Sequence, residues 1–291
     1  MKIRRDITPI KVKAITENYI GDGDFEITQV SSLVNSNEKC LTFFKGTEIK
    51  KVQEINCGAL IVSDGLRDSL EGKDFKSSAI IFATNPMGLF AKFVNERFSN
   101  VFSDEINSNL KENISKFAYI ESGAEVDESC TIYPYASIYQ NCTIGKNCVV
   151  QSSTVVGGVG MSYVQDKNGA YTRLTHLGNV IIEDNVEIGC NTTVLLGILE
   201  STIIKKGAKI GNHVNIGHNS VIGENTYISA GVVVGGATIV GKNCWIAPGV
   251  SIRDNIKIGD NCTIGVGSVV VKDTEPDSIY IGNPARLYKK K

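Results

Sequence analysis

An aliphatic residue recurs at every sixth position over most of the chain after residue 120. The longest unbroken run comprises Ile204, Ile210, Ile216, Ile222, Ile228, Val234, Val240, Ile246, Ile252, Ile258, Ile264 and Val270. Two shorter runs precede it, from Ile120 to Val156 and from Ile182 to Val194. A period of six is neither the 3.6 of an α-helix nor the 2 of a simple exposed strand. It indicates hexapeptide repeats, in which each repeat contributes one short strand.

Two further positions of the repeat support this interpretation. The third residue after the aliphatic is an Asn or Gly in most repeats, and both types tolerate the positive φ of a sharp corner: Asn141, Asn147, Asn185, Asn191, Gly207, Asn219, Asn225, Gly231, Asn243, Gly249, Asn255, Asn261 and Gly267. The fourth residue after the aliphatic is small in most repeats, which suits a narrow core. Three strands would close a coil of about 18 residues, and coils would stack about 4.8 Å apart. The chain resembles the left-handed parallel β-helix proteins; the resemblance implies the left hand and the triangular cross-section.

The cysteines and the overall composition narrow the function classes. Five of the eight cysteines occupy the small inward position: Cys130, Cys142, Cys148, Cys244 and Cys262. No C-x-x-C spacing is present, so we expect reduced core residues in a cytoplasmic protein rather than disulfides or a metal site. The net charge of -1 argues against a protein that binds nucleic acid by electrostatics alone. No apolar run of about 18 residues predicts a membrane span, and the N-terminus does not read as a signal peptide.

The chain is expected to have three parts. Residues 1–112 lack the repeat and predict a small α/β nucleotide-binding domain, with strands within 25–33, 39–44, 58–64 and 77–83 and a helix over 85–98. Residues 113–275 predict the β-helix, and residues 276–291 a C-terminal tail that binds coenzyme A. The polar stretch 103–119 is interpreted as the link between the first two parts. A Gly-rich segment, residues 157–179, leaves the register, and insertions in repeat arrays tend to lie on the binding face.

The three histidines are His176, His213 and His218. His218 directly precedes an Asn corner and should therefore face solvent. Histidine is the best general base near neutral pH, because its unperturbed pKa is about 6.5. Gly236 lies one coil of about 18 residues further on, and its backbone N–H could stabilise an oxyanion while His218 takes a proton. From these residues alone, a non-catalytic interpretation remains an alternative. In it, His218 is a solvated corner histidine, and Gly235 and Gly236 are ordinary turn glycines.

Several stretches resemble the N-acyltransferases of lipid A synthesis, which acylate the amine of a UDP-linked 3-O-acylglucosamine. They are LGNVIIEDNVEIGCNTTVLLGIL, GNHVNIGHNSVIG, VSSLVNSNEKCLTFFKGTEIKKV and ALIVSD. The resemblance implies that His218 is the general base, that Gly236 is the oxyanion donor, and that a homotrimer forms each site between two subunits. The substrate-binding residues expected under this interpretation are Phe43, Tyr163, His176, Asn191, Asn212, His213 and Asn219.

The chain also departs from the pattern of that family. Gly46 and Ile49 stand where the family has Asn and Tyr, which leaves UDP and dTDP both open; Leu195 and Leu196 replace a charged pair. The helices with which the family docks an acyl carrier protein are not recognised. The final GNPAR instead resembles the tail loop of hexapeptide acetyltransferases that use coenzyme A. We therefore expect acyl-CoA as co-substrate and no permanently bound cofactor, with cofactor contacts from Ser229, Gly235, Ala247, Gly265, Lys272, Pro284 and Arg286.

The sequence predicts an N-acyltransferase that moves an acyl group from acyl-CoA to the amine of a UDP- or dTDP-linked amino sugar. Two alternatives keep the reaction class: a carrier-protein-dependent UDP-3-O-acylglucosamine N-acyltransferase and a sugar O-acetyltransferase. A zinc hydratase of the γ-carbonic-anhydrase type is a third, because His213 and His218 are spaced five apart as two of its ligands are. A non-catalytic binding solenoid is the fourth.

Overall fold

A computed structural model describes residues 6–98 and 113–291. The chain divides into two compact units, residues 1–107 and 108–291. The boundary expected at residue 112 and most of the expected link lie outside the described residues. Within the described ranges, no helix combines the length and the apolar character that a membrane crossing requires.

The N-terminal unit is built on one six-stranded sheet in the order β1-β3-β4-β5-β6-β2. Its strands are β1 (Asp6–Lys11), β2 (Tyr19–Gly21), β3 (Glu26–Val30), β4 (Cys40–Phe43), β5 (Ala59–Ser63) and β6 (Ala79–Ala83). The four central strands are parallel, and β1 and β2 join the two edges antiparallel. The four central strands confirm the sequence prediction, whereas β1 and β2 were not expected.

Helices cover both faces of this sheet. They are α1 (Ile49–Glu54), α2 (Arg67–Leu70) and α3 (Pro86–Phe98), with 3₁₀ turns η1 (Val12–Ala14), η2 (Leu33–Asn35) and η3 (Asp64–Leu66). Alternate residues of β5 face opposite sides: Ile61 packs in one cluster with Phe93 of α3, and Leu60 packs in another with Val52 of α1. Parallel sheets are normally covered on both faces in this way, and β5 and β6 are correspondingly apolar along almost their whole length. The small α/β domain and the helix over 85–98 are therefore confirmed.

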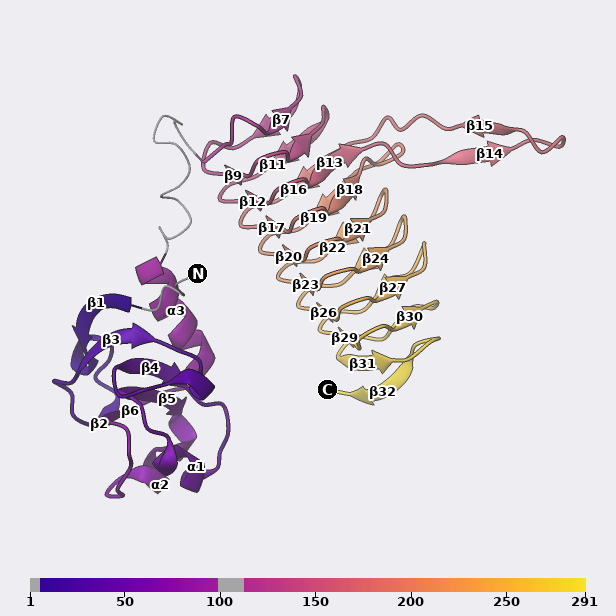
Figure 1. Ribbon diagram of the computed structural model, residues 1–291. Coiled ribbons are helices and arrows are strands. Elements are labelled where there is room, and N and C mark those ends of the chain that lie inside the picture. Colours follow the sequence, from indigo (N-terminus) through magenta and orange to yellow (C-terminus); the bar gives the residue numbers. More distant parts are fainter. Residues whose placement is uncertain (1–5, 99–112) are drawn as a thin grey trace. The chain divides into compact units, whose positions relative to one another are not determined.

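The C-terminal unit is a solenoid of three sheets that run side by side along one axis (Figure 1). The nine-stranded sheet contains β9 (Thr131–Ile132), β12 (Val149–Val150), β17 (Glu187–Ile188), β20 (Lys209–Ile210), β23 (Tyr227–Ile228), β26 (Trp245–Ile246), β29 (Thr263–Ile264), β31 (Ser278–Ile281) and β32 (Arg286–Lys290). The eight-stranded sheet contains β7 (Tyr119–Ile120), β10 (Ser137–Ile138), β13 (Val155–Gly158), β18 (Thr193–Leu195), β21 (Asn215–Ile216), β24 (Val233–Val234), β27 (Ser251–Ile252) and β30 (Val269–Val270). The seven-stranded sheet contains β8 (Glu125–Val126), β11 (Cys142–Ile144), β16 (Val180–Ile182), β19 (Thr202–Ile204), β22 (Val221–Ile222), β25 (Ile239–Val240) and β28 (Lys257–Ile258).

The coil length is 18 residues wherever the repeat is unbroken. Val221 pairs in parallel with Ile239, and Ile239 with Lys257. Two coils are longer, because Ile144 pairs with Ile182 and Ile182 with Ile204. The first extra segment forms the antiparallel hairpin of β14 (Tyr163–Gln165) and β15 (Tyr171–Arg173), which projects away from the solenoid (Figure 1). The second is the short loop 197–201.

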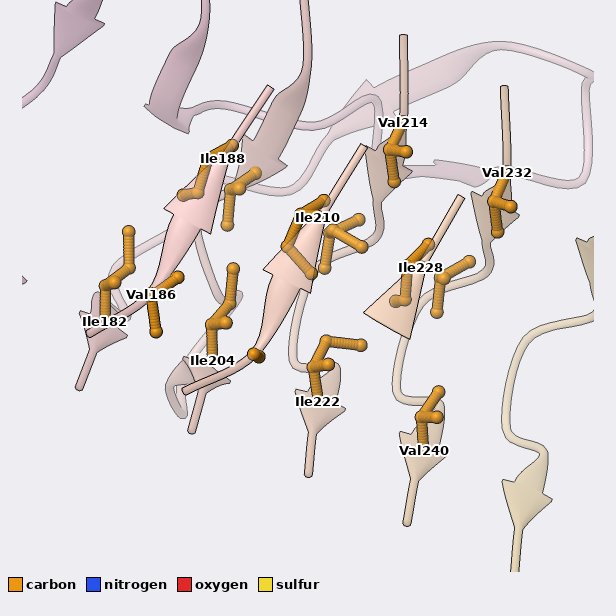
Figure 2. Close-up of a cluster of buried hydrophobic side chains, with 14 of the residues drawn as sticks. Ile182, Val186, Ile188, Ile204, Ile210, Val214, Ile222, Ile228, Val232 and Val240 are labelled. Carbon is orange, nitrogen blue, oxygen red and sulfur yellow. The ribbon is translucent and has the colours of Figure 1, made fainter. Parts of the chain in front are cut away.

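The repeated aliphatic side chains fill the interior of the solenoid. Those of successive coils point inward from all three sheets and stack in rows (Figure 2). The small inward residues have a second role, because they donate to carbonyl oxygens of the next coil. Ser220 Oγ donates to Gly235 O at 3.0 Å, and Cys244 Sγ donates to Gly259 O at 3.1 Å. Hydroxyl and thiol groups are thus tolerated in the core because each satisfies a backbone carbonyl there.

The corners adopt the predicted backbone conformation. All the Asn and Gly residues expected at the third position after the aliphatic have φ between 53° and 73°. His213 occupies one of these positions with φ +55°. The expected fold class, a mainly β hexapeptide-repeat β-helix after a small α/β domain, is confirmed.

The expected tail continues the solenoid. Strand β31 pairs in parallel with β29, and β32 folds back antiparallel on β31. Lys290 forms an ion pair with Glu275, and Lys291 Nζ donates to Asn261 O at 2.6 Å. Two of the three terminal lysines are therefore already engaged. The role of this segment in binding coenzyme A stays a prediction.

Burial makes seven of the eight thiols unreactive. It raises the pKa of Cys142 to about 12 and the pKa values of Cys57, Cys148 and Cys244 to about 11. The thiolate is the nucleophile, and only Cys190 is partly exposed. Iodoacetamide at about pH 8 should therefore add to Cys190 first and leave the folded chain with one adduct by intact-mass spectrometry, against eight in denaturant. Equally fast alkylation of Cys142 would contradict the packing described here.

Candidate active site

The candidate site centres on the corner where the chain passes from the eight-stranded to the seven-stranded sheet. The second residue after the inward aliphatic forms a column along this edge, here called the His218 corner: Leu196, His218, Gly236, Asp254 and Lys272. Both extra segments, residues 157–179 and 197–201, leave the solenoid at this same edge, immediately before His218. The two loops that lengthen the coils thus leave the solenoid at the edge that carries His218.

The tautomer of the neutral His218 ring follows from its hydrogen bonds. Its Nδ1 lies 3.0 Å from Asn219 Oδ1, and the same oxygen accepts from the Ile198 N–H at 3.1 Å. A backbone N–H can only donate, which assigns the Asn219 amide with its oxygen toward both groups. His218 Nδ1 must then carry the hydrogen. In the neutral ring Nε2 then keeps its lone pair, as a general base requires.

Gly236 lies against the face of the His218 ring, over its Nε2 end. A Cβ on Gly236 would lie 2.6 Å from His218 Nε2, so only glycine leaves the ring in place. At some other corners the equivalent amide donates to a side chain of a neighbouring coil, as the Lys242 N–H does to Asp260 Oδ1 at 3.0 Å. Among the described residues, the Gly236 N–H has no such acceptor. Within the described part of this corner, the amides of His218 and Asp254 have no such acceptor either. The corner thus places a free base and a free backbone donor together, as acyl transfer needs.

His176 lies beside His218 but is not open to a ligand. It is 5% exposed, and its ring contacts the His218 ring with centroids 5.7 Å apart at 78°. His176 Nδ1 lies 2.9 Å from Leu196 O, and Nε2 lies 2.9 Å from Ser162 Oγ. Both ring nitrogens are therefore engaged by the protein itself, although the sequence suggested a substrate contact.

Six of the expected residues lie on a different edge. The corner from the nine-stranded to the eight-stranded sheet, here called the His213 corner, carries Asn191, Asn212, His213, Ser229, Ala247 and Gly265. Ser229 and Ala247 are buried, and His213 is exposed. The Asn212 side chain accepts from the Cys190 N–H at 2.8 Å, which fixes this corner. Within one chain, these residues and His218 stand at opposite edges of the eight-stranded sheet.

The remaining expected residues are dispersed. Tyr163 lies on the hairpin, 43% exposed, and packs edge-on against Tyr171. Phe43 belongs to the N-terminal unit, where its ring lies 5.1 Å from that of Phe90. Pro284 and Arg286 belong to the turn and strand of the terminal hairpin, and both are exposed.

A polar groove adjoins the histidine corner. It has a cavity volume of about 530 Å³ between β8, β11 and the loops 177–179 and 199–201. The loop that forms one wall also carries Ile198, whose N–H binds Asn219. Glu125 and Glu200 contribute carboxylates to the lining, which contains no lysine or arginine. Such a lining suits sugar hydroxyls or an amine better than a diphosphate.

Sequence analysis missed three groups that position the site. They are the Ser162 hydroxyl, the Ile198 N–H and Thr202 Oγ1, which accepts from the Asn219 N–H at 2.8 Å. Ser162 and Ile198 lie in the segments without the sixfold period, so no register places them. Thr202 does occupy the small inward position of its repeat, and that pattern could have indicated it.

The metal ligands of the hydratase alternative are not grouped in this chain. Over residues 6–98 and 113–291, no three His, Cys, Asp or Glu side chains are close enough to hold a metal ion. His213 and His218 lie at opposite edges of one sheet, and the nitrogens of His176 are engaged.

Comparison with known proteins decides between the enzyme classes. The family model for the bacterial transferase hexapeptide (six repeats) matches residues 123–158, 201–236 and 237–272. A UDP-3-O-acylglucosamine N-acyltransferase of Campylobacter lari is 36% identical over 239 residues, which cover 73% of this chain and 72% of the relative. The chain belongs to the UDP-3-O-acylglucosamine N-acyltransferase family. It is an acyltransferase, and the resemblance that the sequence suggested is confirmed.

Other relatives match shorter parts of this acyltransferase. A Francisella tularensis protein of the same name is 51% identical over 77 residues, which cover 26% of this chain and 23% of the relative. Among solved structures, the Francisella novicida UDP-N-acetylglucosamine acyltransferase is similar with a TM-score of 0.49 and 21% identity, over 60% of this chain and 68% of that one.

Proposed function

We propose that this acyltransferase moves an acyl group from a thioester to the amine of a UDP-linked amino sugar. The observation that carries the proposal is the packing of the Gly236 backbone against the Nε2 end of the His218 ring, which brings a candidate base and a backbone N–H to one corner. The acceptor class is supported by the Campylobacter lari relative, whose name states a UDP-linked glucosamine.

The reaction follows from these two groups. The neutral amine attacks the thioester carbonyl carbon, and a C–N bond forms. His218 Nε2 accepts the amine proton, and the Gly236 N–H donates to the carbonyl oxygen as it becomes negative. The tetrahedral intermediate then breaks its C–S bond. His218 returns the proton to the departing sulfur, which leaves an amide, a thiol and the neutral base.

The groove beside the histidine corner is the proposed place of the acceptor sugar. Its lining offers the carboxylates of Glu125 and Glu200 and the amides of Asn141 and Asn179 to hydroxyl groups. Because this lining contains no lysine or arginine, the diphosphate is proposed to bind outside the groove. The N-terminal unit, with Phe43, is the proposed platform for the nucleotide base.

Acyl-CoA is the proposed donor, and an acyl carrier protein is the alternative that family membership favours. Lys272 lies at the C-terminal end of the His218 corner, and Arg253 directly precedes Asp254 of the same corner. The terminal hairpin carries Arg286, and all three side chains are exposed. Their guanidinium and ammonium groups could pair with the phosphates of coenzyme A. Lys290 is engaged by Glu275 and contributes less.

A homotrimer is proposed because one chain separates the two sets of expected residues. The His213 corner of a second copy, facing the His218 corner of the first, would bring them together. Light scattering at micromolar concentration should give about three times the 31.4 kDa chain mass. A monomer would remove the inter-subunit site.

Thioester turnover tests the function. The purified chain is mixed with UDP-linked sugars that carry a free amine, and with acyl-CoA or acyl-carrier protein of short and long chains. Amide formation by mass spectrometry, with release of one thiol per amide, is expected for at least one pair. Turnover of hydroxyl-only UDP-sugars at an equal rate would instead identify an O-acyltransferase.

Removing a phosphate contact tests the donor. Lys272→Ala and Arg286→Ala should each raise the KM for acyl-CoA by roughly 3- to 10-fold, because an exposed charge-assisted contact contributes about 1 kcal/mol. The KM for the sugar should not change, and Lys167→Ala, on the tip of the hairpin, is the matched charge control. Unchanged donor KM in both variants, with turnover of acyl-carrier protein, would contradict the coenzyme A assignment.

A further inference from the structure

We infer that His176 and Ser162 are positioning residues that hold the ring of the catalytic base His218. The inference rests on the proposed function, because it assigns these residues to the base of that reaction. Neither residue touches the reacting atoms. Both belong to the extra segment 157–179, Ser162 where the hairpin begins and His176 where it ends.

Hydrogen bonds on both sides fix the His176 ring. Leu196 O can only accept, so His176 Nδ1 carries the hydrogen at 2.9 Å from it. In the neutral ring His176 Nε2 is then an acceptor, and the Ser162 hydroxyl, 2.9 Å away, donates to it. The ring is buried, and a Cβ on Gly160 would lie 3.0 Å from its Cε1, so the neighbouring backbone also confines it. The two hydrogen bonds and the burial therefore hold the His176 ring in one orientation.

This fixed ring restrains His218 from one side. The two rings meet edge to face at 78°, with centroids 5.7 Å apart, a favourable arrangement for aromatic rings. Asn219 holds His218 Nδ1 by a hydrogen bond, and the Gly236 backbone lies against its Nε2. Without His176, the His218 ring would be free to rotate away from Gly236, and the lone pair would no longer face the amine.

The arrangement also explains where the hairpin is attached. Its two ends are joined by the Ser162–His176 hydrogen bond, and the Leu196 carbonyl that receives His176 lies one coil below His218 in the same column. The hairpin is thereby anchored on the catalytic corner. We therefore expect that loss of this anchor changes the orientation of the His218 ring more than it changes the affinity for either substrate.

Kinetics separate positioning from binding. His176→Phe keeps an aromatic ring but loses both hydrogen bonds, and Ser162→Ala removes one of them. Each should lower kcat by about 10- to 100-fold with both KM values within about twofold, because a displacement of about 1 Å in a reacting group costs on the order of 10²-fold. His176→Gln offers a donor and an acceptor at similar spacing and should restore most of kcat. Thr172→Ala, on exposed β15, is the matched control and should not differ from the wild type.

A double variant tests whether Ser162 acts through His176. If it does, Ser162→Ala should add no further loss in the His176→Phe background, since coupled residues are not additive. Full additivity of the two losses, or a His176→Phe enzyme within about threefold of wild-type kcat, would overturn the inference.

Imidazole NMR gives a readout that does not need turnover. The chain has three histidines, so selective ¹⁵N labelling yields three ring systems, which His176→Gln and His213→Asn assign. The wild type should show His218 as a single tautomer with hydrogen on Nδ1, and His176→Phe should show exchange between tautomers. A single unchanged His218 tautomer in His176→Phe overturns the inference even if acyl transfer is observed. Exchange in that variant supports it even if no acceptor is turned over, in which case the proposed function alone fails.

Discussion

Replacing His218 with Ala or Asn should lower kcat at pH 7 by at least about 10²-fold, with little change in substrate binding. The reason is chemical: Asn219 leaves the lone pair on His218 Nε2, and neither replacement offers a group that accepts a proton there. Loss of a general base usually costs about 10²–10⁴ in rate. Steady-state kinetics give kcat, and thermal shifts with each substrate report binding separately.

His213→Asn is the matched control for that experiment. His213 is exposed and has φ +55°, a conformation that Asn tolerates, so the backbone should not change. The variant should lose much less kcat than His218→Ala. A His218→Ala enzyme with near wild-type kcat would show that the amine needs no enzymic base, since a neutral amine is already nucleophilic. The fold and the substrate class would survive that result, but the mechanism would not.

The repeat made most of the solenoid predictable because one period controls several features at once. An inward aliphatic at every sixth position fixes which side of each strand is buried. The Asn or Gly three residues later then fixes the corner, and each one that the sequence indicates has positive φ. The same register placed Gly236 one coil from His218, and the two are in contact.

Residues without the period could not be placed in this way. The segment 157–179 has no register, so nothing in the sequence returns His176 to His218 rather than to solvent. The short strands β14 and β15 hold three residues each, too few for a distinct pattern. In the N-terminal unit, β1 and β2 pair at the sheet edges and lack the continuous apolar runs that marked β5 and β6.

The five-residue spacing of His213 and His218 shows a different limit. That spacing matched two ligands of the hydratase alternative, but here it spans one side of the coil and puts the two rings at opposite edges. The separation follows from the six-residue side, which the sequence already indicated. What the sequence of one chain lacks is the second copy that the proposed trimer would supply.

Gly236→Ala should lower kcat by at least about 10²-fold although it adds a single methyl group. The new Cβ would lie 2.6 Å from His218 Nε2 and 2.7 Å from Cε1, well inside ordinary contact distance. The ring is held by Asn219 and His176, so it cannot yield without losing its orientation. The methyl group also blocks the approach of the carbonyl oxygen to the Gly236 N–H, and loss of one oxyanion donor costs about 10²–10³ in kcat.

The backbone itself should accept the methyl group, because the equivalent positions of this corner carry the side chains of Leu196 and Asp254. Any fall in the melting temperature of Gly236→Ala should therefore come from the clash with the His218 ring. It should be reversed when Gly236→Ala is combined with His218→Ala, which removes that ring. If the loss of kcat in the single variant arises from the displaced base, Gly236→Ala should add much less to the rate loss in the His218→Ala background than in the wild type. The rate loss that Gly236→Ala still causes in the His218→Ala background measures the contribution of the blocked Gly236 N–H. A single variant with near wild-type kcat would mean that neither the ring nor the amide has to stay where the structure places it.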